Sequence, residues 1–401
     1  MIDFFYSEPM NTLSQDLYHF LVHYIGDRPD QRITFAEYMD WVLYHPQFGY
    51  YNNPTDSIGM EGDFFTSPHL GTDFAELLAD CFWQMWQQLD RPDSFDLIEL
   101  GAGQGLIAQD VLNYVNHRYP SFFTALNYHI LEQSQSFLKR QRNYLYPWQT
   151  AGKLSWLTWD DLQPNSLVGC LFSNEFFDAL PVHRLCWHQG QWQEIYVTVN
   201  AVHPDSAFQE IRDRPSDPRL AEYFDWVGID VHRQNYSDRY CTEVNLKALA
   251  SMERIAQSLK RGFILTLDYG YPASQYYHPQ REQGTLQCYY HHRRHDDPYA
   301  YLGEQDITAH VDMTALERTG QEAGLETCLL TQQGLFLMAL GLGDRLSQNN
   351  QHSQGSVMET LQRRESLHQL INPLGLGGFY VLVQGKEAKL DLPMPDPIQM
   401  V

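Results

Sequence analysis

The chain has 401 residues, of which 43% are hydrophobic and 19% charged, and this composition excludes an intrinsically disordered protein. A single domain usually has about 100 to 200 residues, so the length indicates a main core with a sizeable addition. The 50 acidic and 27 basic residues give a formal net charge of −23, which should repel phosphate backbones and attract cationic partners. We therefore expect no nucleic-acid partner.

The first part of the chain, residues 15–88, is mainly helical by the spacing of its apolar residues. It is interrupted by residues 50–71, a segment rich in Gly, Pro, Asn, Asp, Ser and Thr. We expect a long structured loop there, and loops of this length in compact proteins are usually functional or disordered.

From residue 96 onward, short apolar runs alternate with helical patterns, which is typical of a parallel sheet covered by helices. Strands are expected at 96–100, 128–132, 154–158, 169–173 and 263–267. Helices are expected at 106–117, 136–145, 246–259 and 313–322. The last strands are expected at 335–340 and 379–383.

Other segments are less regular. Residues 184–199, broken by Gln189-Gly190, favour a β-hairpin inserted after the fourth strand. Residues 200–237 allow no assignment, and 348–354 indicates a solvated loop.

A glycine-rich loop follows the first expected strand, in the run Glu99-Leu100-Gly101-Ala102-Gly103-Gln104-Gly105. A dinucleotide fingerprint would need its third glycine at position 106, which is Leu106. The spacing Gly-x-Gly-x-Gly after an acidic residue instead resembles the first motif of Rossmann-like methyltransferases. There the glycines admit the amino-acid part of S-adenosylmethionine. A plain Gly-rich turn is the alternative.

Two acidic positions follow the next expected strands, at the sheet edge where open α/β folds bind ligands. Glu132 ends the second strand, where its carboxylate can accept both ribose hydroxyls of the cofactor. It lies about thirty residues past the loop instead of the roughly twenty typical of such units, and residues 120–127 look like a small insertion that explains the difference. Asp160 and Asp161 follow the third strand and are candidates for binding the adenine amino group. A turn or helix cap is an equally good interpretation of this pair.

After the fourth strand comes the run 173–181, which should face the transferable methyl group. Its candidate substrate contacts are Asn174, Glu175 and Asp178, and Asn174 is also a candidate cofactor contact. The sequence therefore predicts an α/β fold with a doubly wound, Rossmann-like methyltransferase core, an N-terminal helical and loop cap, and an inserted β-hairpin. We divide it into a cap at 1–92, a core at 93–388 with insertions around 182–245 and 271–312, and a tail at 389–401.

Seven blocks in one order resemble the MidA-like methyltransferases, a family that includes mitochondrial complex I assembly-factor protein arginine methyltransferases. The blocks are Tyr38-Met39 with Pro46-x-x-Gly49-Tyr50-Tyr51, Gly62-Asp63-Phe64-Phe65-Thr66-Ser67-Pro68, 99–105, 174–182, Asp268-Tyr269-Gly270-Tyr271, Gly284-Thr285-Leu286 and 306–312. They span about residues 32 to 341. The resemblance implies S-adenosylmethionine as cofactor and an N-terminal segment folded over it. Gly62, Thr66, Ser67 and Pro68 would then line or cap the cofactor site, and a purely structural loop is the alternative.

The resemblance also implies arginine as the methyl acceptor, in a protein substrate equivalent to a subunit of a respiratory NADH dehydrogenase complex. A guanidinium stays protonated, so carboxylates must hold its planar fork and turn one nitrogen toward the methyl group. The blocks and the residues next to them supply the acidic residues Glu175, Asp178, Asp268, Glu304, Asp306 and Asp312. We take Glu175 and Asp178 as catalytic candidates with Asn174. His310 is a candidate proton acceptor or, equally, a core histidine.

Two other functions stay open. The run Asn174-Glu175-Phe176-Phe177 loosely resembles the Asn-Pro-Pro-Tyr/Phe loop of adenine and glutamine N-methyltransferases, with Glu175 and Phe176 in place of the prolines. The second alternative is a cofactor-binding assembly factor without turnover.

The six cysteines are scattered without a Cys-x-x-Cys pair, so the sequence predicts neither a zinc module nor a disulfide scaffold. Residues 288–295 hold three histidines and depart from the family pattern, but an Arg-rich loop explains them more simply than a metal does, and we expect no metal. Residues 1–20 lack a presequence pattern, and no stretch reaches the roughly 18 apolar residues that span a bilayer. We expect a cytoplasmic protein without membrane insertion.

Overall fold

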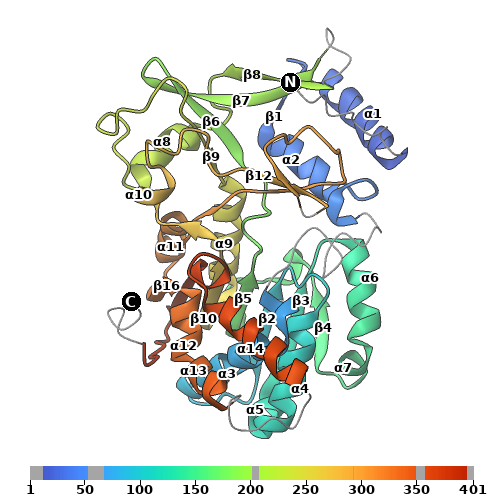
Figure 1. Ribbon diagram of the computed structural model, residues 1–401, viewed down its shortest axis with the longest axis vertical. Coiled ribbons are helices and arrows are strands. Elements are labelled where there is room, and N and C mark those ends of the chain that lie inside the picture. Colours follow the sequence, from blue (N-terminus) through green and yellow to red (C-terminus); the bar gives the residue numbers. More distant parts are fainter. Residues whose placement is uncertain (1–11, 53–66, 201–206, 292, 349–356, 395–401) are drawn as a thin grey trace.

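The computed structural model of the protein describes residues 12–52, 67–200, 207–291, 293–348 and 357–394. Its elements form two stacked parts: a main sheet covered by helices, in the lower half of Figure 1, and an antiparallel sheet that packs with the N-terminal helices.

The main sheet contains, within the described ranges, seven strands in the order β16-β17-β10-β5-β2-β3-β4. Neighbours from β10 to β4 are parallel, and β17 runs antiparallel between β10 and β16. The α/β, Rossmann-like fold class predicted from the sequence is confirmed. The strands are β2 (Phe95–Leu100), β3 (Leu126–Leu131), β4 (Leu154–Leu157), β5 (Leu167–Asn174), β10 (Leu259–Asp268), β16 (Glu326–Gln332) and β17 (Tyr380–Lys386).

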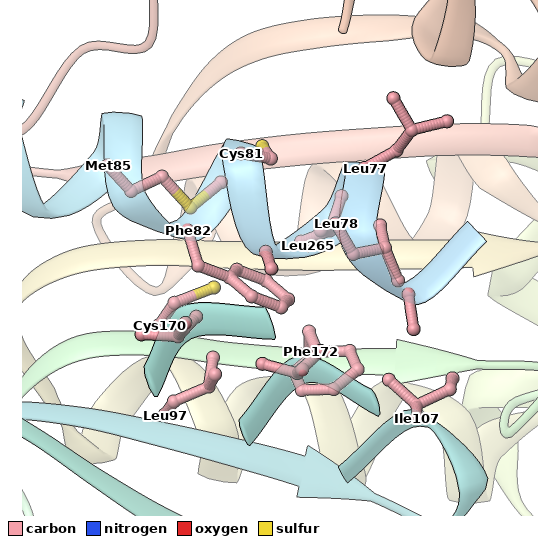
Figure 2. Close-up of a cluster of buried hydrophobic side chains, with 14 of the residues drawn as sticks. Leu77, Leu78, Cys81, Phe82, Met85, Leu97, Ile107, Cys170, Phe172 and Leu265 are labelled. Atoms are coloured by element: carbon pink, nitrogen blue, oxygen red, sulfur yellow. The ribbon is translucent and has the colours of Figure 1, made fainter. Parts of the chain in front are cut away.

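One face of the main sheet is covered by α3 (Asp73–Gln88) and α4 (Leu106–Arg118). Figure 2 shows the apolar side of α3 lying over the strands, with Phe82 above Phe172 of β5. Full burial of a side chain of this size contributes about 1.5–3 kcal/mol. The helix α3 lies in the segment that the sequence assigned to the cap, yet it packs on the core sheet. The boundary between cap and core at residue 92 stays a prediction.

The opposite face is covered by α9 (Leu246–Ser258) and α11 (Met313–Glu322), whose apolar sides pack against β2, β5 and β10. Besides these and the two N-terminal helices, the described chain contains α5 (Pro120–Ala125), α6 (Gln135–Tyr144), α7 (Tyr146–Thr150), α8 (Pro218–Trp226), α10 (Ala273–Tyr276), α12 (Gln333–Ala339), α13 (Leu342–Gln348) and α14 (Val357–Ile371). Single 3-10 turns occur at Tyr50–Asn52, Ser67–Leu70, Trp159–Asp161 and Leu376–Gly378.

The predicted hairpin is present as β6 (His183–His188) and β7 (Gln191–Val199), joined at Gln189-Gly190. Both turn residues have positive φ, as a tight two-residue hairpin requires. The hairpin is the centre of a larger antiparallel sheet that adds β1 (Ile33–Thr34), β8 (Phe208–Asp213) and β9 (Cys241–Val244). The N-terminal helices α1 (Thr12–Gly26) and α2 (Phe35–Tyr44) pack with this sheet, so the cap and the insertion share one core.

Smaller strands connect the two parts of the molecule. The insertion around 271–312 forms a three-stranded antiparallel sheet of β12 (Gln287–Tyr290), β13 (Arg293–His295) and β14 (Asp306–Thr308). A parallel pair consists of β11 (Gly270–Tyr271) and β15 (Val311–Asp312). Figure 1 shows β12 lying between the upper sheet and the main sheet.

One expectation about the C-terminal part of the core was wrong. Residues 335–340 were expected to form a strand but lie mostly in α12, because a short apolar run fits a buried helix as well as a strand. The strand beside β17 is instead β16, which is half-buried and mixes polar with apolar residues. The unassigned segment 200–237 supplies β8 and α8, and most of the expected loop at 348–354 lies outside the described residues.

The cysteines also depart from expectation. Cys186 of β6 and Cys241 of β9 are paired directly across the two strands and form a disulfide, with Cα atoms 4.1 Å apart. The two cysteines are 55 positions apart in the sequence, a separation that gives no signal of the pairing.

Candidate active site

A cavity of about 180 Å³ lies at the carboxyl ends of β2, β3 and β5. The chain leaves β2 toward β3 and β4 on one side and continues with β5 on the other, which makes this edge a topological switch point of the sheet. Open α/β sheets bind their ligands at such points. The wall combines the glycine loop, the end of β3, the segment after β5, and tyrosines from the N-terminal part.

The glycine loop contributes bare backbone to the cavity. Gly101 and Gly103 line it with φ values of +65° and +52°, a left-handed conformation that glycine adopts without a steric cost. A Cβ at Gly101 would come within 2.9 Å of the Phe176 ring, whereas one at Gly103 would meet no atom within 4 Å. The space over Gly103 is therefore open to a ligand. Gly105 caps α4 and is not part of the lining.

Glu99, at the end of β2, is buried at the floor of the cavity. Its Oε2 accepts a hydrogen bond of 2.7 Å from the Tyr128 hydroxyl. Burial raises the pKa of the Glu99 carboxyl to about 8, and the Tyr128 hydrogen bond opposes this shift only in part. The side chain is therefore largely neutral at pH 7.

Glu132 follows β3 on another side of the cavity. Its Oε1 accepts hydrogen bonds of 2.9 Å from the backbone N–H groups of Gln133 and Ser134, which hold the carboxyl in place. Gln141 donates to Glu132 Oε2 at 3.2 Å and to the Gly103 carbonyl at 2.8 Å, so one amide joins the glycine loop to this carboxyl. Desolvation raises the pKa of Glu132 to about 7.

The far end of the cavity is acidic and comes from the segment after β5. Asn174 Nδ2 donates to Glu175 Oε1 at 3.0 Å, and the Tyr269 hydroxyl donates to Asp178 Oδ2 at 2.5 Å. Glu175 has a φ of +52°, an uncommon conformation that costs free energy and is concentrated at functional sites. Burial raises the pKa of Asp178 to about 6 and that of Glu175 well above its usual value, which nearby Asp178 raises further.

Three acceptor atoms at this end have no hydrogen-bond partner among the described residues. They are Asn174 Oδ1, Glu175 Oε2 and Asp178 Oδ1, and all three are buried. Leaving a buried acceptor unsatisfied costs about 1–3 kcal/mol each. This end of the cavity therefore has three acceptor atoms that a ligand with hydrogen-bond donors could satisfy.

Two acidic residues that were not among the catalytic candidates complete the acidic end. Asp306 of β14 lines the cavity and accepts a hydrogen bond of 2.8 Å from the hydroxyl of Tyr51, another lining residue. Asp268, at the end of β10, is buried behind the cavity and accepts hydrogen bonds from the backbone N–H groups of residues 176 and 177 at 3.2 and 3.0 Å. Asp268 thus fixes the loop that carries Glu175 and Asp178.

Comparisons with known proteins agree with this geometry. Residues 77–331 match the model of a family described as "Putative S-adenosyl-L-methionine-dependent methyltransferase". The chain belongs to this family. The match confirms the resemblance to MidA-like methyltransferases and the enzyme class expected from the glycine loop.

Related proteins share most of the chain. The Drosophila melanogaster NDUFAF7 homolog, named a mitochondrial protein arginine methyltransferase, is 30% identical over 86% of this chain and 79% of its own length. The Homo sapiens protein of that name is 28% identical over 88% of this chain and 80% of its length. A superfamily member from Burkholderia thailandensis, solved with bound S-adenosyl-homocysteine, has a TM-score of 0.82 at 30% identity and covers 95% of this chain and 94% of its own.

The names of the Drosophila melanogaster and Homo sapiens relatives describe mitochondrial proteins, which contradicts the cytoplasmic location expected from the sequence. Among the described helices, none combines the length and the apolar character needed to cross a bilayer.

The residues of the methyltransferase cavity fit S-adenosylmethionine. The open space over Gly103 would take the amino-acid part of the cofactor against bare backbone, and the Glu132 carboxyl is placed to accept ribose hydroxyls. Pro68 also lines the cavity, while Ser67 is buried beside it and accepts a hydrogen bond of 3.3 Å from Gln333. Gly62 and Thr66 lie outside the described residues.

The structure does not bring Asp160 and Asp161 to the cavity lining. The Asp160 side chain is 98% exposed and pairs with Arg254 at 3.1 Å. Asp161 accepts two hydrogen bonds of 2.7 Å from the backbone and hydroxyl of Thr158, which makes it the cap of a 3-10 turn. The turn interpretation of this pair fits the geometry, and the contact with adenine stays a prediction.

His310 also lies outside the cavity lining. Its ring stacks on Tyr271 and contacts the edge of Tyr269, whose hydroxyl donates to Asp178. Burial, and then the nearby Arg281, lower the pKa of His310 to about 4. A neutral ring in this position supports Tyr269 from behind, and any effect on Asp178 passes through that tyrosine.

Proposed function

We propose that this methyltransferase modifies arginine side chains of a protein substrate and that the acidic end of the cavity holds the guanidinium group. The three unsatisfied acceptors on Asn174, Glu175 and Asp178 carry this proposal. A guanidinium presents five N–H donors in a plane and pairs with carboxylates in fork geometry. The relatives named protein arginine methyltransferases support the same substrate class.

The ionisation of the Glu175 and Asp178 carboxyl groups depends on whether a cation is bound. Without a ligand, burial raises the pKa values of Glu175 and Asp178, so the empty site carries less negative charge than its composition suggests. A guanidinium at hydrogen-bond distance favours the ionised carboxylates and lowers both pKa values. Binding of the cation and ionisation of the site are therefore coupled, which favours arginine over a neutral amide.

S-adenosylmethionine supplies an electrophilic methyl group on a sulfonium. The chain's own residues must then orient one guanidinium nitrogen in line with that methyl and take up the proton that the nitrogen loses. Asp178 Oδ1 suits the second task, because its carboxyl has a pKa of about 6 and Tyr269 holds its other oxygen. The Tyr51–Asp306 hydrogen bond closes this end of the cavity.

The physiological substrate that we propose is a subunit of a respiratory NADH dehydrogenase complex, as the family resemblance implies. The chain's net charge of −23 agrees with a basic, arginine-bearing partner.

The decisive experiment incubates the full chain with isotope-labelled S-adenosylmethionine and proteins of a cell extract, and identifies the labelled residue by mass spectrometry. We expect labelled methylarginine with the wild-type protein. Glu175→Gln and Asp178→Asn should each lower transfer by about 100-fold or more, the range of a lost acid–base group, while cofactor affinity changes little. Asp161→Asn, an exposed carboxyl outside the cavity, is the matched control and should retain full activity.

Other outcomes would select another function. Labelled glutamine or another amino nitrogen would replace the arginine assignment with the first alternative drawn from the sequence. Saturable cofactor binding by a folded protein that transfers no methyl group to any extract protein would support an assembly factor without turnover.

A further inference from the structure

The three-stranded sheet β13-β12-β14 extends outward from the acidic end of the cavity. Asp306 of β14, which lines the cavity, lies directly opposite Tyr289 of β12, and Tyr289 lies directly opposite Arg294 of β13. Directly opposed residues of antiparallel strands project their side chains from the same face of the sheet. Asp306, Tyr289 and Arg294 therefore form one row that leads from the cavity wall to the outermost strand.

The neighbouring arginine projects from the other face. Arg293 pairs with Tyr290, and successive residues along a strand alternate between faces. The ring of Tyr290 stacks on Tyr301 with centroids 3.8 Å apart. On that same face, Cys288 and Ile307 are buried in the apolar core around α1 and α2. Arg293 and Arg294 are thus two adjacent exposed arginines, of which only Arg294 shares the face of Asp306.

The guanidinium of Arg294 makes no hydrogen bond or ion pair with any residue in the described ranges. In contrast, Arg184 and Arg345 pair with carboxylates, as expected in a chain with many more acidic than basic residues. The charge of Arg294 lowers the pKa of Tyr289, its neighbour in the row, against the effect of burial, and with Arg281 it helps burial to lower the pKa of His310.

We propose that Arg294 is a specificity-determining residue that binds an acidic side chain of the protein substrate, close in sequence to the arginine that enters the cavity. This inference rests on the proposed arginine methyltransferase function. Asp306 and Arg294 lie two strands apart in this sheet, which corresponds to about 10 Å. An extended peptide covers this distance in about three residues. The substrate motif is thus an arginine with an aspartate or glutamate about three residues away.

The test uses S-adenosylmethionine with a trideuterated methyl group, proteins of a cell extract, and the full chain as wild type, Arg294→Glu and Arg293→Glu. Mass spectrometry locates each new methylarginine and its flanking residues. An exposed ion pair is worth little, so we expect acidic residues to be enriched about two- to fivefold near the sites that the wild type modifies. Arg294→Glu should abolish or reverse this preference, and Arg293→Glu should preserve it.

A charge exchange on the best-modified substrate completes the test. Replacement of its acidic neighbour by lysine should lower transfer by the wild type two- to fivefold and raise transfer by Arg294→Glu. If wild-type sites show no acidic enrichment, or if the two variants behave alike, the role of Arg294 is overturned while arginine methylation stands. If the wild type forms no methylarginine on any protein, the proposed function itself fails, and the inference with it.

Discussion

Gly103 is the residue at which cofactor binding is most directly testable. Its left-handed backbone and the open space at its Cβ position mean that Gly103→Asp should fold, because aspartate tolerates this conformation. The new side chain would occupy the space that the cofactor needs. We expect affinity for S-adenosylmethionine to fall at least about tenfold in calorimetric titration, equivalent to about 1.4 kcal/mol.

Gly152→Asp provides the matched control for this change. Gly152 has a φ of +71° and likewise no atom within 4 Å of a Cβ, but it lies in the turn before β4, outside the cavity. Both variants add one negative charge at a left-handed position. Equal affinities of the two variants for the cofactor would show that the glycine loop does not bind it.

The raised pKa of the buried Glu99 carboxyl predicts that the stability of the protein depends on pH. Its pKa is about 8 in the folded protein and 4.5 in a free carboxyl, so between these values the unfolded chain has released a proton that the folded chain retains. The free energy of unfolding therefore falls as pH rises from about 4.5 to about 8. Glu99→Gln keeps an acceptor for Tyr128 but cannot ionise. Denaturant titrations across this range should give a flatter profile for Glu99→Gln, and parallel profiles would contradict a neutral buried Glu99.

Among elements, β6 and β9 are joined by the disulfide between Cys186 and Cys241. A bond that closes a loop of 55 residues restricts the unfolded chain, and its removal from a native protein costs about 2–5 kcal/mol. Cys186→Ser should lower the free energy of unfolding by this amount, and reductant should destabilise the wild type but not the variant. Cys328→Ser, at a free and partly buried cysteine, should change stability little.

Thiol counting offers an independent check of the same bond. If all six cysteines of the oxidised wild type react with a thiol reagent after unfolding, then β6 and β9 are not covalently joined.

The elements also show what the sequence can and cannot predict. The parallel strands around the cavity were predictable because each is a short apolar run that alternates with helical patterns, as at 96–100 before the helix at 106–117 and at 263–267 after the helix at 246–259. The run 335–340 has the same composition but lies mostly in a helix, since no local signal separates a buried strand from one side of a buried helix. The strand β16 escaped notice because it lies at the edge of the sheet and is only partly buried.

At the scale of the whole molecule, the cavity draws on segments that only folding brings together. Glu99, Glu132 and Glu175 were predictable because each lies at the end of a strand of one sheet or directly after it. The partnership of Tyr51 with Asp306 joins residues 255 positions apart, and spacing alone could not reveal it. Both residues belong to blocks that resemble the family, so only the resemblance could have indicated that they lie at the site. Asp161, in contrast, follows a strand as a site residue would, but its side chain accepts the hydrogen bonds of a capped turn.

The net charge of −23 acts on the whole molecule and predicts how salt affects catalysis. A negative field raises the encounter rate with a basic protein, and salt screens it over about 10 Å at 0.1 M. The ratio kcat/KM for a substrate with net positive charge should therefore fall several-fold between about 20 and 200 mM salt, mainly through KM. A short substrate peptide without net charge is the control and should respond weakly. The preference for acidic residues assigned to Arg294 determines which arginine of a substrate is methylated and not how often the two proteins meet. The same arginines should therefore be chosen at either salt concentration. Equal salt dependence for both substrates would mean that the charge of the chain serves its solubility and not its encounters.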